Sequence, residues 1–164
     1  MAARFRIIEL GRDDGMAPEL LALNNQFAQE LSLLGDEKAR HLVHEAFMAS
    51  RIGTADALIL AFDQDAAYQN PNFEWFKERF DRFVYIDRVV VSPAMRGRGA
   101  ARALYEALFK RAAKVGHARV VCEVNLDPPN PASDAFHFSL GFEQIGLAAL
   151  PAAAKTVRYF SHAL

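Results

Sequence analysis

The apolar positions near the start of the chain recur every three or four residues, a spacing that predicts amphipathic helices. The first predicted helix begins at Pro18, because proline suits the first helical position, and ends at Gly35. Asp36 is expected to cap a second helix that runs to about Ser50. The apolar positions are Leu20, Leu23, Phe27, Leu31 and Leu34 in the first helix, and Leu42, Val43, Ala46 and Phe47 in the second.

Short apolar runs, several rich in β-branched and aromatic residues, predict strands over 5–10, 55–62, 83–91, 119–125, 142–147 and 156–161. Between them the spacing predicts helices over 101–115 and 131–140. Asn72 is expected to cap a short helix that carries Phe73, Phe76 and Phe80 on one side. The order β-α-α-β-β-α-β-α-β-β predicts an α/β (α+β) fold, in which one mixed central sheet is covered by helices.

The composition narrows the class of protein. A chain of 164 residues with 52% hydrophobic and 24% charged residues is expected to form one globular domain over 1–164. No apolar run approaches the ~20 residues that span a bilayer, and the first residues lack the apolar core of a signal peptide. The lone Cys122 excludes an intrachain disulfide and a multi-cysteine zinc site. We therefore expect a cytoplasmic protein that does not bind membranes.

The charges are unevenly distributed, although the whole chain has a net charge of only −1. This net charge argues against a nucleic-acid partner. Between positions 96 and 119 the only acid is Glu106, whereas the basic residues are Arg96, Arg98, Arg102, Lys110, Arg111, Lys114 and Arg119. The cluster favours a local anionic ligand such as a phosphorylated cofactor, and a solvated helix face is the alternative.

The stretch 89–102 combines a buried strand, a glycine-bearing loop and the start of a helix. Small residues at positions 97, 99, 100 and 101 let a ligand approach the backbone. The free N–H groups at the start of the helix, together with its dipole, are able to hold a pyrophosphate. Arg96, Arg98 and Arg102 add charge-assisted contacts.

Three kinds of nucleotide or cofactor loop are possible for this stretch. A P-loop requires Gly-Lys-Ser/Thr, which is absent. A dinucleotide-binding fingerprint would be Gly97-x-Gly99-x-x-Arg102, with Glu123 at a suitable distance beyond it. However, this places arginine where a small residue must pack, and the loop from Val91 to Gly97 is too long for the tight first turn. The third possibility is a loop that binds the pyrophosphate of coenzyme A.

Two motifs together resemble the GNAT superfamily of N-acetyltransferases. The first is Arg96-x-x-Gly99-x-Ala101 after a Val-x-Val strand. The second, residues 130–142, has an Asn, two small residues, an aromatic position and then Leu-Gly-Phe. The run 127–131 is also similar to a bacterial stand-alone subgroup of predicted acetyltransferases. The resemblance implies a GNAT-like fold, with helices on both faces of the sheet and strands splayed at the cofactor site, and acetyl-CoA as co-substrate.

The resemblance also implies roles for individual residues. Val89, Val90 and Val91 would present backbone groups to the pantetheine arm, and Asn130 and Ser133 would contact that arm. The pyrophosphate would be held by Arg96, Gly97, Arg98, Gly99, Ala100, Ala101 and Arg102. Position 137 would lie near the thioester sulfur. The family usually has tyrosine there, whereas this chain has His137, which titrates near ~6.5 instead of ~10.

Attack on a thioester requires an acceptor amine that has lost a proton, a donor for the developing oxyanion and an acid for the leaving thiolate. The candidates for the base are Asp87 and Glu123, the carboxylates within the strands beside the site, and otherwise water or the substrate itself manages the proton. The alternative role of the two carboxylates is an ordinary ion pair with Arg88 or Arg119. Asp87 is expected to share a strand face with Tyr85, Val89 and Val91. His137 is the candidate acid, or else a histidine packed on its helix. By resemblance, a backbone N–H near 89–91 is the oxyanion donor.

Three other features are expected to be structural. His41-x-x-His44-Glu45 lacks a third ligand at a recognisable spacing, so no metal site is expected and its residues are taken as solvated. Cys122 is expected in the core and not as a nucleophile. The phenylalanines at 73, 76 and 80 are expected to pack in the core, and the segment 63–80 that holds them could equally roof the acceptor pocket.

Two functions remain open from the sequence. The first is an enzyme that transfers an acetyl group from acetyl-CoA to a small-molecule or peptide amine, by direct attack in a ternary complex. The second is an acyl-CoA-binding sensor or regulatory module without turnover, which His137 in place of tyrosine keeps possible. The sequence allows either a monomer or a homodimer.

Overall fold

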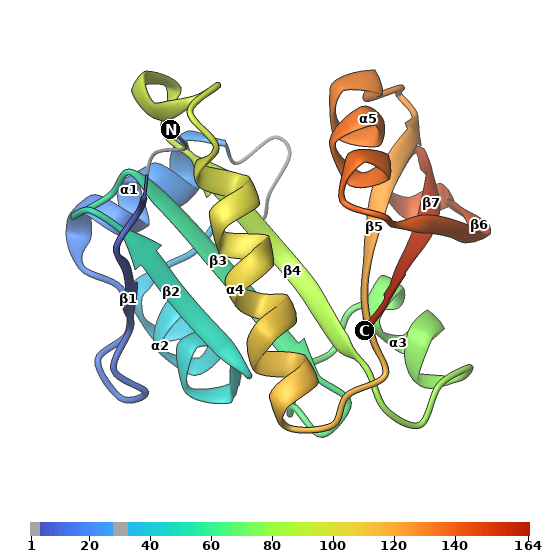
Figure 1. Ribbon diagram of the computed structural model, residues 1–164, viewed down its shortest axis with the longest axis horizontal. Helices are drawn as coiled ribbons and strands as arrows, with labels where there is room; N and C mark the ends of the chain where they lie inside the picture. Colours follow the sequence, from blue (N-terminus) through green and yellow to red (C-terminus); the bar gives the residue numbers. More distant parts are fainter. Residues whose placement is uncertain (1–3, 28–32) are drawn as a thin grey trace.

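One mixed seven-stranded sheet organises the computed structural model, which describes residues 4–27 and 33–164 (Figure 1). The strand order is β1-β2-β3-β4-β5-β7-β6, and only the β4–β5 pair is parallel. The strands are β1 (Ile7–Glu9), β2 (Met48–Ile52), β3 (Ala57–Asp63), β4 (Val84–Val91), β5 (Arg119–Asp127), β6 (Glu143–Leu150) and β7 (Lys155–Ala163).

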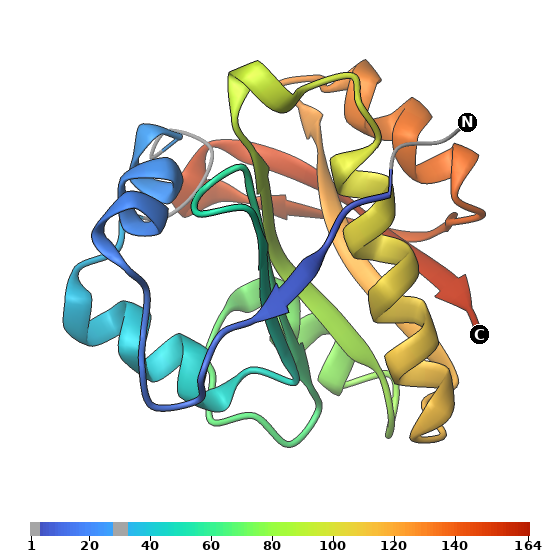
Figure 2. The same cartoon turned by 60° about the vertical axis from the view of Figure 1, so that its left-hand side comes forward.

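Helices cover both faces of this sheet, as Figures 1 and 2 show. The first face packs against α1 (Pro18–Gln26), α2 (Asp36–Glu45) and α3 (Pro71–Lys77), and the second against α4 (Ala100–Lys114) and α5 (Pro131–Ser139). Two 3₁₀ turns, η1 (Pro93–Met95) and η2 (Pro151–Ala153), complete the described elements. The predicted fold class is confirmed, because β3, which is buried on both faces from Ala57 to Phe62, lies between two apolar layers.

The sheet opens between β4 and β5. These strands pair only at Val84↔Val120 and Tyr85↔Val121, and then they diverge toward the η1 turn and α5 (Figure 1). A β-bulge accompanies the opening: neighbouring residues Leu60 and Ala61 of β3 pair with β4 residues two positions apart, which leaves Asp87 as the extra residue. Because a bulge bends its strand and increases the local twist, it helps to turn β4 away from β5.

The bulge corrects one sequence prediction. Asp87 was expected to share a face with Tyr85, Val89 and Val91, as simple alternation requires. Instead Tyr85 packs in the core under α1–α3, whereas Val89 and Val91 pack against the core under α4. The extra residue in β4 reverses the alternation, so residues of the same parity face opposite sides before and after position 87.

The prediction for 36–50 was wrong in its second half. Helix α2 ends at Glu45, and Met48–Ile52 form β2, which pairs with β1 on one side and β3 on the other. The apolar run around Phe47 is locally compatible with a helix or a strand, and pairing with β1 and β3 stabilises the strand. Gly35 is the N-cap of α2. The first helix, predicted to continue to Gly35, is also shorter: α1 ends at Gln26, and neither Phe27 nor residues 33–35 are helical. Leu31, the apolar position predicted between them, lies outside the described residues.

Asn70, and not Asn72, caps the short helix α3. The side-chain Oδ1 of Asn70 accepts hydrogen bonds from the backbone N–H of Asn72 (2.8 Å) and of Phe73 (3.4 Å), and Pro71 occupies the first helical position. The side chain of Asn72 is therefore available for contacts with β5 and β7.

The remaining predicted strands and helices are present, with ends shifted by a few residues. None of the helices in residues 4–27 and 33–164 is long and apolar enough to cross a membrane.

Candidate active site

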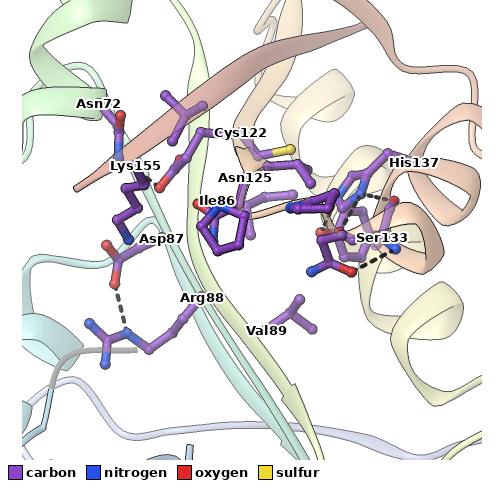
Figure 3. Close-up of a pocket in the computed structure, with 17 residues that line it drawn as sticks. Asn72, Ile86, Asp87, Arg88, Val89, Cys122, Asn125, Ser133, His137 and Lys155 are labelled. Carbon is purple, nitrogen blue, oxygen red and sulfur yellow. Dashed lines mark hydrogen bonds and ion pairs between the residues drawn. The ribbon is translucent and has the colours of Figure 1, made fainter. Parts of the chain in front are cut away.

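A cleft of about 580 Å³ occupies the opening between β4 and β5. One end, on the side of the sheet covered by α1–α3, has mostly polar and charged side chains, namely Asn72, Asp87, Arg88, Glu123 and Lys155. The other end, under α4 and α5, has Tyr105, Ser133 and His137 beside the apolar side chains of Ile86, Val89, Cys122 and Val124. Figure 3 shows Asn72, Asp87 and Lys155 on one side of the cleft and Ser133 and His137 on the other. The cleft therefore passes through the sheet.

Glu123 lies on β5 at the centre of a hydrogen-bond network. The Tyr85 hydroxyl lies 2.9 Å from Oε1 and 2.8 Å from Oε2, and the Asn72 amide nitrogen donates to Oε1 at 3.0 Å. Tyr159 on β7 donates in turn to the amide oxygen of Asn72 at 2.9 Å. The carboxylate is thus held in one orientation by residues from β4, β7 and α3.

Burial raises the pKa of Glu123 to about 7, because a carboxylate loses hydration in this part of the protein. The hydrogen bond from Tyr85 lowers the pKa, and the nearby charge of Asp87 raises it. A carboxyl group with a pKa near neutrality is suited to accept a proton at physiological pH. The prediction of Glu123 as a base candidate therefore gains a physical reason that the sequence did not contain.

Tyr85→Phe removes the hydrogen bond that favours the charged form of Glu123. The pKa of Glu123 is therefore expected to rise above about 7, so that a larger fraction is protonated at a given pH. If Glu123 is the base, the acid limb of the kcat/KM profile moves to higher pH, whereas the activity at the alkaline plateau is largely kept. The measurement is the pH profile of both proteins, and an unshifted acid limb would contradict this coupling.

Asp87 has different hydrogen-bond and ion-pair partners from Glu123. Its carboxylate accepts a hydrogen bond from Arg88 Nε at 2.7 Å in an ion pair whose side chains are each 5% exposed, and it also accepts one from the Tyr68 hydroxyl. Arg88 donates further to Asn24, which is fully buried. The ion pair with Arg88 that the sequence left open is present, and it stabilises the carboxylate as a structural anion.

His137 is buried under α5, with only 5% of its surface exposed. Its Nδ1 lies 2.7 Å from the Ser133 carbonyl oxygen, and its Nε2 lies 2.8 Å from the Tyr105 hydroxyl. Because a carbonyl only accepts, Nδ1 carries the ring proton and Nε2 accepts the proton of Tyr105. Burial lowers the pKa of His137, so the ring is neutral near pH 7. The surrounding aromatic rings belong to Tyr105, Phe136, Phe142 and Phe160.

The loop after β4 exposes the N-terminal end of α4. Gly97 and Gly99 have φ angles of +76° and +87°, a region that glycine adopts easily. A Cβ at either position would meet no described atom within 4 Å, so the space above the loop is open. Gly99 is the N-cap and makes no side-chain cap, which leaves the first N–H groups of α4, at Ala100 and Ala101, directed toward that space.

Three arginines surround this loop. The Arg96 guanidinium lies 5.1 Å from the Phe27 ring centroid, and Arg102 donates to Ser139 Oγ at 2.9 Å, which connects α4 to α5. Within residues 4–27 and 33–164, Arg98 makes no hydrogen bond or ion pair. Its guanidinium is exposed beside the open end of α4.

Of the other predicted cofactor residues, Val89, Asn130 and Ser133 line the cleft. The backbone of Val89, Val90 and Val91 pairs with β3 on one side, and the edge that faces β5 is unpaired because the β4–β5 ladder ends at Tyr85. Asn130 and Ser133 lie across the cleft on α5, where Asn130 Oδ1 accepts from the Ser133 backbone N–H at 3.3 Å. The cleft is therefore lined by residues of the second motif, whereas the loop 96–102 of the first motif follows the end of β4 and contributes no residue to the lining.

The features interpreted as structural have ordinary contacts. His41 contacts the Ala67 carbonyl oxygen at 3.1 Å, and His44 pairs with Asp13 at 3.0 Å. The described part of the chain contains no cluster of three or more metal-ligating side chains. Cys122 is buried beside the cleft, and Phe73 and Phe76 are fully buried in the core. Of the segment 63–80, which could cover the acceptor pocket, Asn72 lines the cleft.

Sequence reasoning missed Asn72, Tyr105 and Lys155 as cleft residues. Asn72 was assigned to the cap that Asn70 makes. Tyr105 had a usable signal, since it is adjacent to Leu104 and three residues before Leu108 on the apolar stripe of α4, where a hydroxyl needs a buried partner. Lys155 had no local signal, because only the sheet brings β7 beside β5.

Comparisons with known proteins agree with this architecture. The model of the acetyltransferase (GNAT) family matches residues 37–142. The protein ACIAD1637 from Acinetobacter baylyi ADP1, solved under the description "putative acetyltransferase", has a TM-score of 0.72 at 19% identity, with 98% of this chain and 92% of that chain covered. The structure of yncA from Salmonella typhimurium, solved with acetyl-CoA, has a TM-score of 0.71 at 16% identity, with 99% of this chain and 95% of that chain covered. The ribosomal-protein-S18-alanine N-acetyltransferase from Escherichia coli has a TM-score of 0.65 at 16% identity, with 98% of this chain and 94% of that chain covered. A search of curated proteins gives no match.

These findings define an acyl-group transferase built on a sheet that opens between two parallel strands. The chain belongs to the GNAT acetyltransferase family, since the family model covers well over half of its residues. The resemblance inferred from the two motifs is confirmed, and so is the prediction that the protein is an N-acyltransferase.

Proposed function

We propose that this enzyme transfers an acetyl group from acetyl-CoA to a small-molecule or peptide amine by direct attack in a ternary complex. The observation that carries the proposal is the cleft through the sheet, which holds a buried, hydrogen-bonded carboxylate and is lined by the strand β4 that leads on to the open N-terminus of α4. Among the structural neighbours, yncA was solved with acetyl-CoA. In this chain the residues around the opening fit the same cofactor.

The loop 96–102 is suited to the pyrophosphate. Its glycines leave open space above the backbone, and the uncapped N–H groups at the start of α4 are directed toward that space. We assign Arg96, Arg98 and Arg102 to charge-assisted contacts with the phosphates. The backbone of Gly97, Gly99, Ala100 and Ala101 forms the floor of this site.

The unpaired edge of β4 is suited to the pantetheine arm. Backbone groups of Val89, Val90 and Val91 lack a strand partner on this side, so an extended arm with amide groups is able to pair there as an added strand. Asn130 and Ser133 face this edge from α5. A bound acetyl thioester supplies the electrophilic carbonyl group for the reaction.

Glu123 is the favoured base. It is oriented by Tyr85 and Asn72 within the cleft, and its pKa of about 7 lets the carboxylate accept a proton at neutral pH. Asp87 is the weaker candidate, because the ion pair with Arg88 would be lost when it takes a proton. The amine therefore enters from the side of the sheet that bears Glu123.

The opposite end of the cleft must stabilise the oxyanion and the leaving thiolate. A free backbone N–H of β4 near Val89 is positioned along the cleft to donate to the oxyanion. His137 and Tyr105 are the hydrogen-bonded pair at the sulfur end, and the acid for the thiolate belongs to this pair.

The test is release of free CoA thiol when the protein is incubated with acetyl-CoA and a panel of amines. The panel contains alkylamines, polyamines, amino acids and peptides with free N-termini. Amine-dependent thiol release, with the acetylated amine detected by mass spectrometry, is the expected result. Tight calorimetric binding of acetyl-CoA without turnover across the panel would instead favour an acyl-CoA sensor.

A further inference from the structure

Tyr105 places a hydroxyl group at the sulfur end of the cleft. The residue projects from the inner face of α4, its side chain is only 1% exposed, and it lines the cleft together with Val89 and His137. The hydroxyl lies 2.8 Å from His137 Nε2. Its ring is fixed by edge-to-face contacts with Phe109, Phe136 and Phe142. Both the ring and the hydroxyl are therefore held in one place.

A leaving thiolate at this end of the cleft would have few ways to gain a proton. Ile86, Val89 and Val124 have no acidic proton, and burial raises the pKa of the Cys122 thiol and of the Tyr105 phenol alike, so acidity does not separate these two groups. Of the two, the Tyr105 hydroxyl is the one that a hydrogen bond orients within the cleft. The Nδ1 proton of His137 is committed to the Ser133 carbonyl, and its Nε2 has no proton to give. Amides and aliphatic hydroxyls are much weaker acids than a phenol.

We propose that Tyr105 is a catalytic residue that donates its phenolic proton to the CoA thiolate. The inference deepens the proposed function and rests on it. As the carbon–sulfur bond breaks, its electron pair remains on sulfur, the O–H bond of Tyr105 breaks and an S–H bond forms. The phenolate then recovers a proton from water after CoA has left the cleft.

His137 has a positioning role in this arrangement. Its Nε2 accepts from the Tyr105 hydroxyl, and the bond from Nδ1 to the Ser133 carbonyl fixes the ring in the tautomer that makes this possible. The family usually has tyrosine at position 137. In this chain Tyr105, on the neighbouring helix α4, supplies the phenol instead. The two helices α4 and α5 together therefore place one phenol at the sulfur end.

The experiment compares Tyr105→Phe with His137→Gln in the full chain. The first variant removes only the hydroxyl, and the second keeps an oxygen that is able to accept from Tyr105. With the amine that gives turnover, Tyr105→Phe is expected to lower kcat by about 10²-fold or more, with little change in the KM for acetyl-CoA. His137→Gln is expected to lower kcat less than Tyr105→Phe does, because glutamine keeps an acceptor for the hydroxyl but positions it less firmly. Thermal unfolding and calorimetric binding of acetyl-CoA show whether each variant is folded and loaded.

Each outcome decides the assignment. Full kcat in Tyr105→Phe overturns it, and so does a loss in His137→Gln that equals or exceeds the loss in Tyr105→Phe, because His137 would then be the acid. A Tyr105→Phe protein that is unfolded or no longer binds acetyl-CoA also overturns it, in favour of a structural hydroxyl. If wild-type protein releases no CoA thiol with any amine, the proposed function fails instead, and this result is visible before any variant is made.

Discussion

Glu123→Gln is expected to lower kcat by about 10²- to 10⁴-fold, the range over which a positioned general base contributes. Glutamine has nearly the same shape and keeps an acceptor for Tyr85 and Asn72, but it accepts no proton from the amine. Binding of acetyl-CoA should be nearly unchanged, because the carboxylate lies on the side of the sheet covered by α1–α3, whereas the loop 96–102 leads into α4, which packs on the other side. Steady-state kinetics and calorimetry measure the two quantities separately.

The pH profile gives a second, independent check on Glu123. Because its pKa is raised to about 7, the carboxylate predominates above pH 7 and is lost progressively below it. Wild-type kcat/KM should therefore fall as pH decreases through 7, and this acid limb should be absent in Glu123→Gln. Glu106→Gln, at an exposed position on α4, is the matched control and should behave as wild type. Full activity of Glu123→Gln would show that Glu123 is not the base, and that water or the substrate removes the proton of the amine.

Arg96→Ala combined with Arg98→Ala is expected to weaken acetyl-CoA binding by about 2–4 kcal/mol, since each lost contact is a hydrogen bond to a charged phosphate. This corresponds to a dissociation constant about 30- to 900-fold higher. Both side chains are exposed, so the free energy of unfolding should change little. Isothermal calorimetry with acetyl-CoA is the measurement, and the affinity of the variant should depend less on salt than that of wild type.

The control for this pair is Lys110→Ala with Lys114→Ala. This control also removes two positive charges, but from exposed positions near the opposite end of α4, about 20 Å from the loop. If the loss of affinity came from net charge alone, both double variants would bind acetyl-CoA equally poorly. If neither double variant changes the affinity, the assignment of Arg96 and Arg98 to the phosphates is wrong.

Local patterns were sufficient for most of the fold. The strand 83–91 and the helix 101–115 were predicted because each carries a strong signal, a β-branched run in one and a three-four spacing ended by Gly116 in the other. The strand β2 was missed because Met48–Ile52 has no distinctive alternation, and its pairing with β1 and β3 gave it a buried place in the sheet. Local propensity is weak beside such tertiary contacts.

The candidate site was predictable only in part. The loop 96–102 and the block 130–142 were predicted to form one cofactor site because glycine, arginine and helix-start positions have chemical meaning in the sequence itself. The choice between Asp87 and Glu123 was not predictable. It depends on Arg88 pairing with one carboxylate and on Tyr85 and Asn72 holding the other. These contacts join residues from β4, β5 and α3.

The sequence by itself determined the class of this protein, because the loop that suits a pyrophosphate is a continuous stretch whose glycines, arginines and helix start work through local geometry. Only the tertiary structure decided the chemistry beside that loop. A single extra residue at Asp87 reverses the faces of β4, the β4–β5 ladder ends after two pairs, and α4 brings Tyr105 against His137. Such effects arise between segments far apart in the chain, where burial and hydrogen bonding set each group's pKa and orientation.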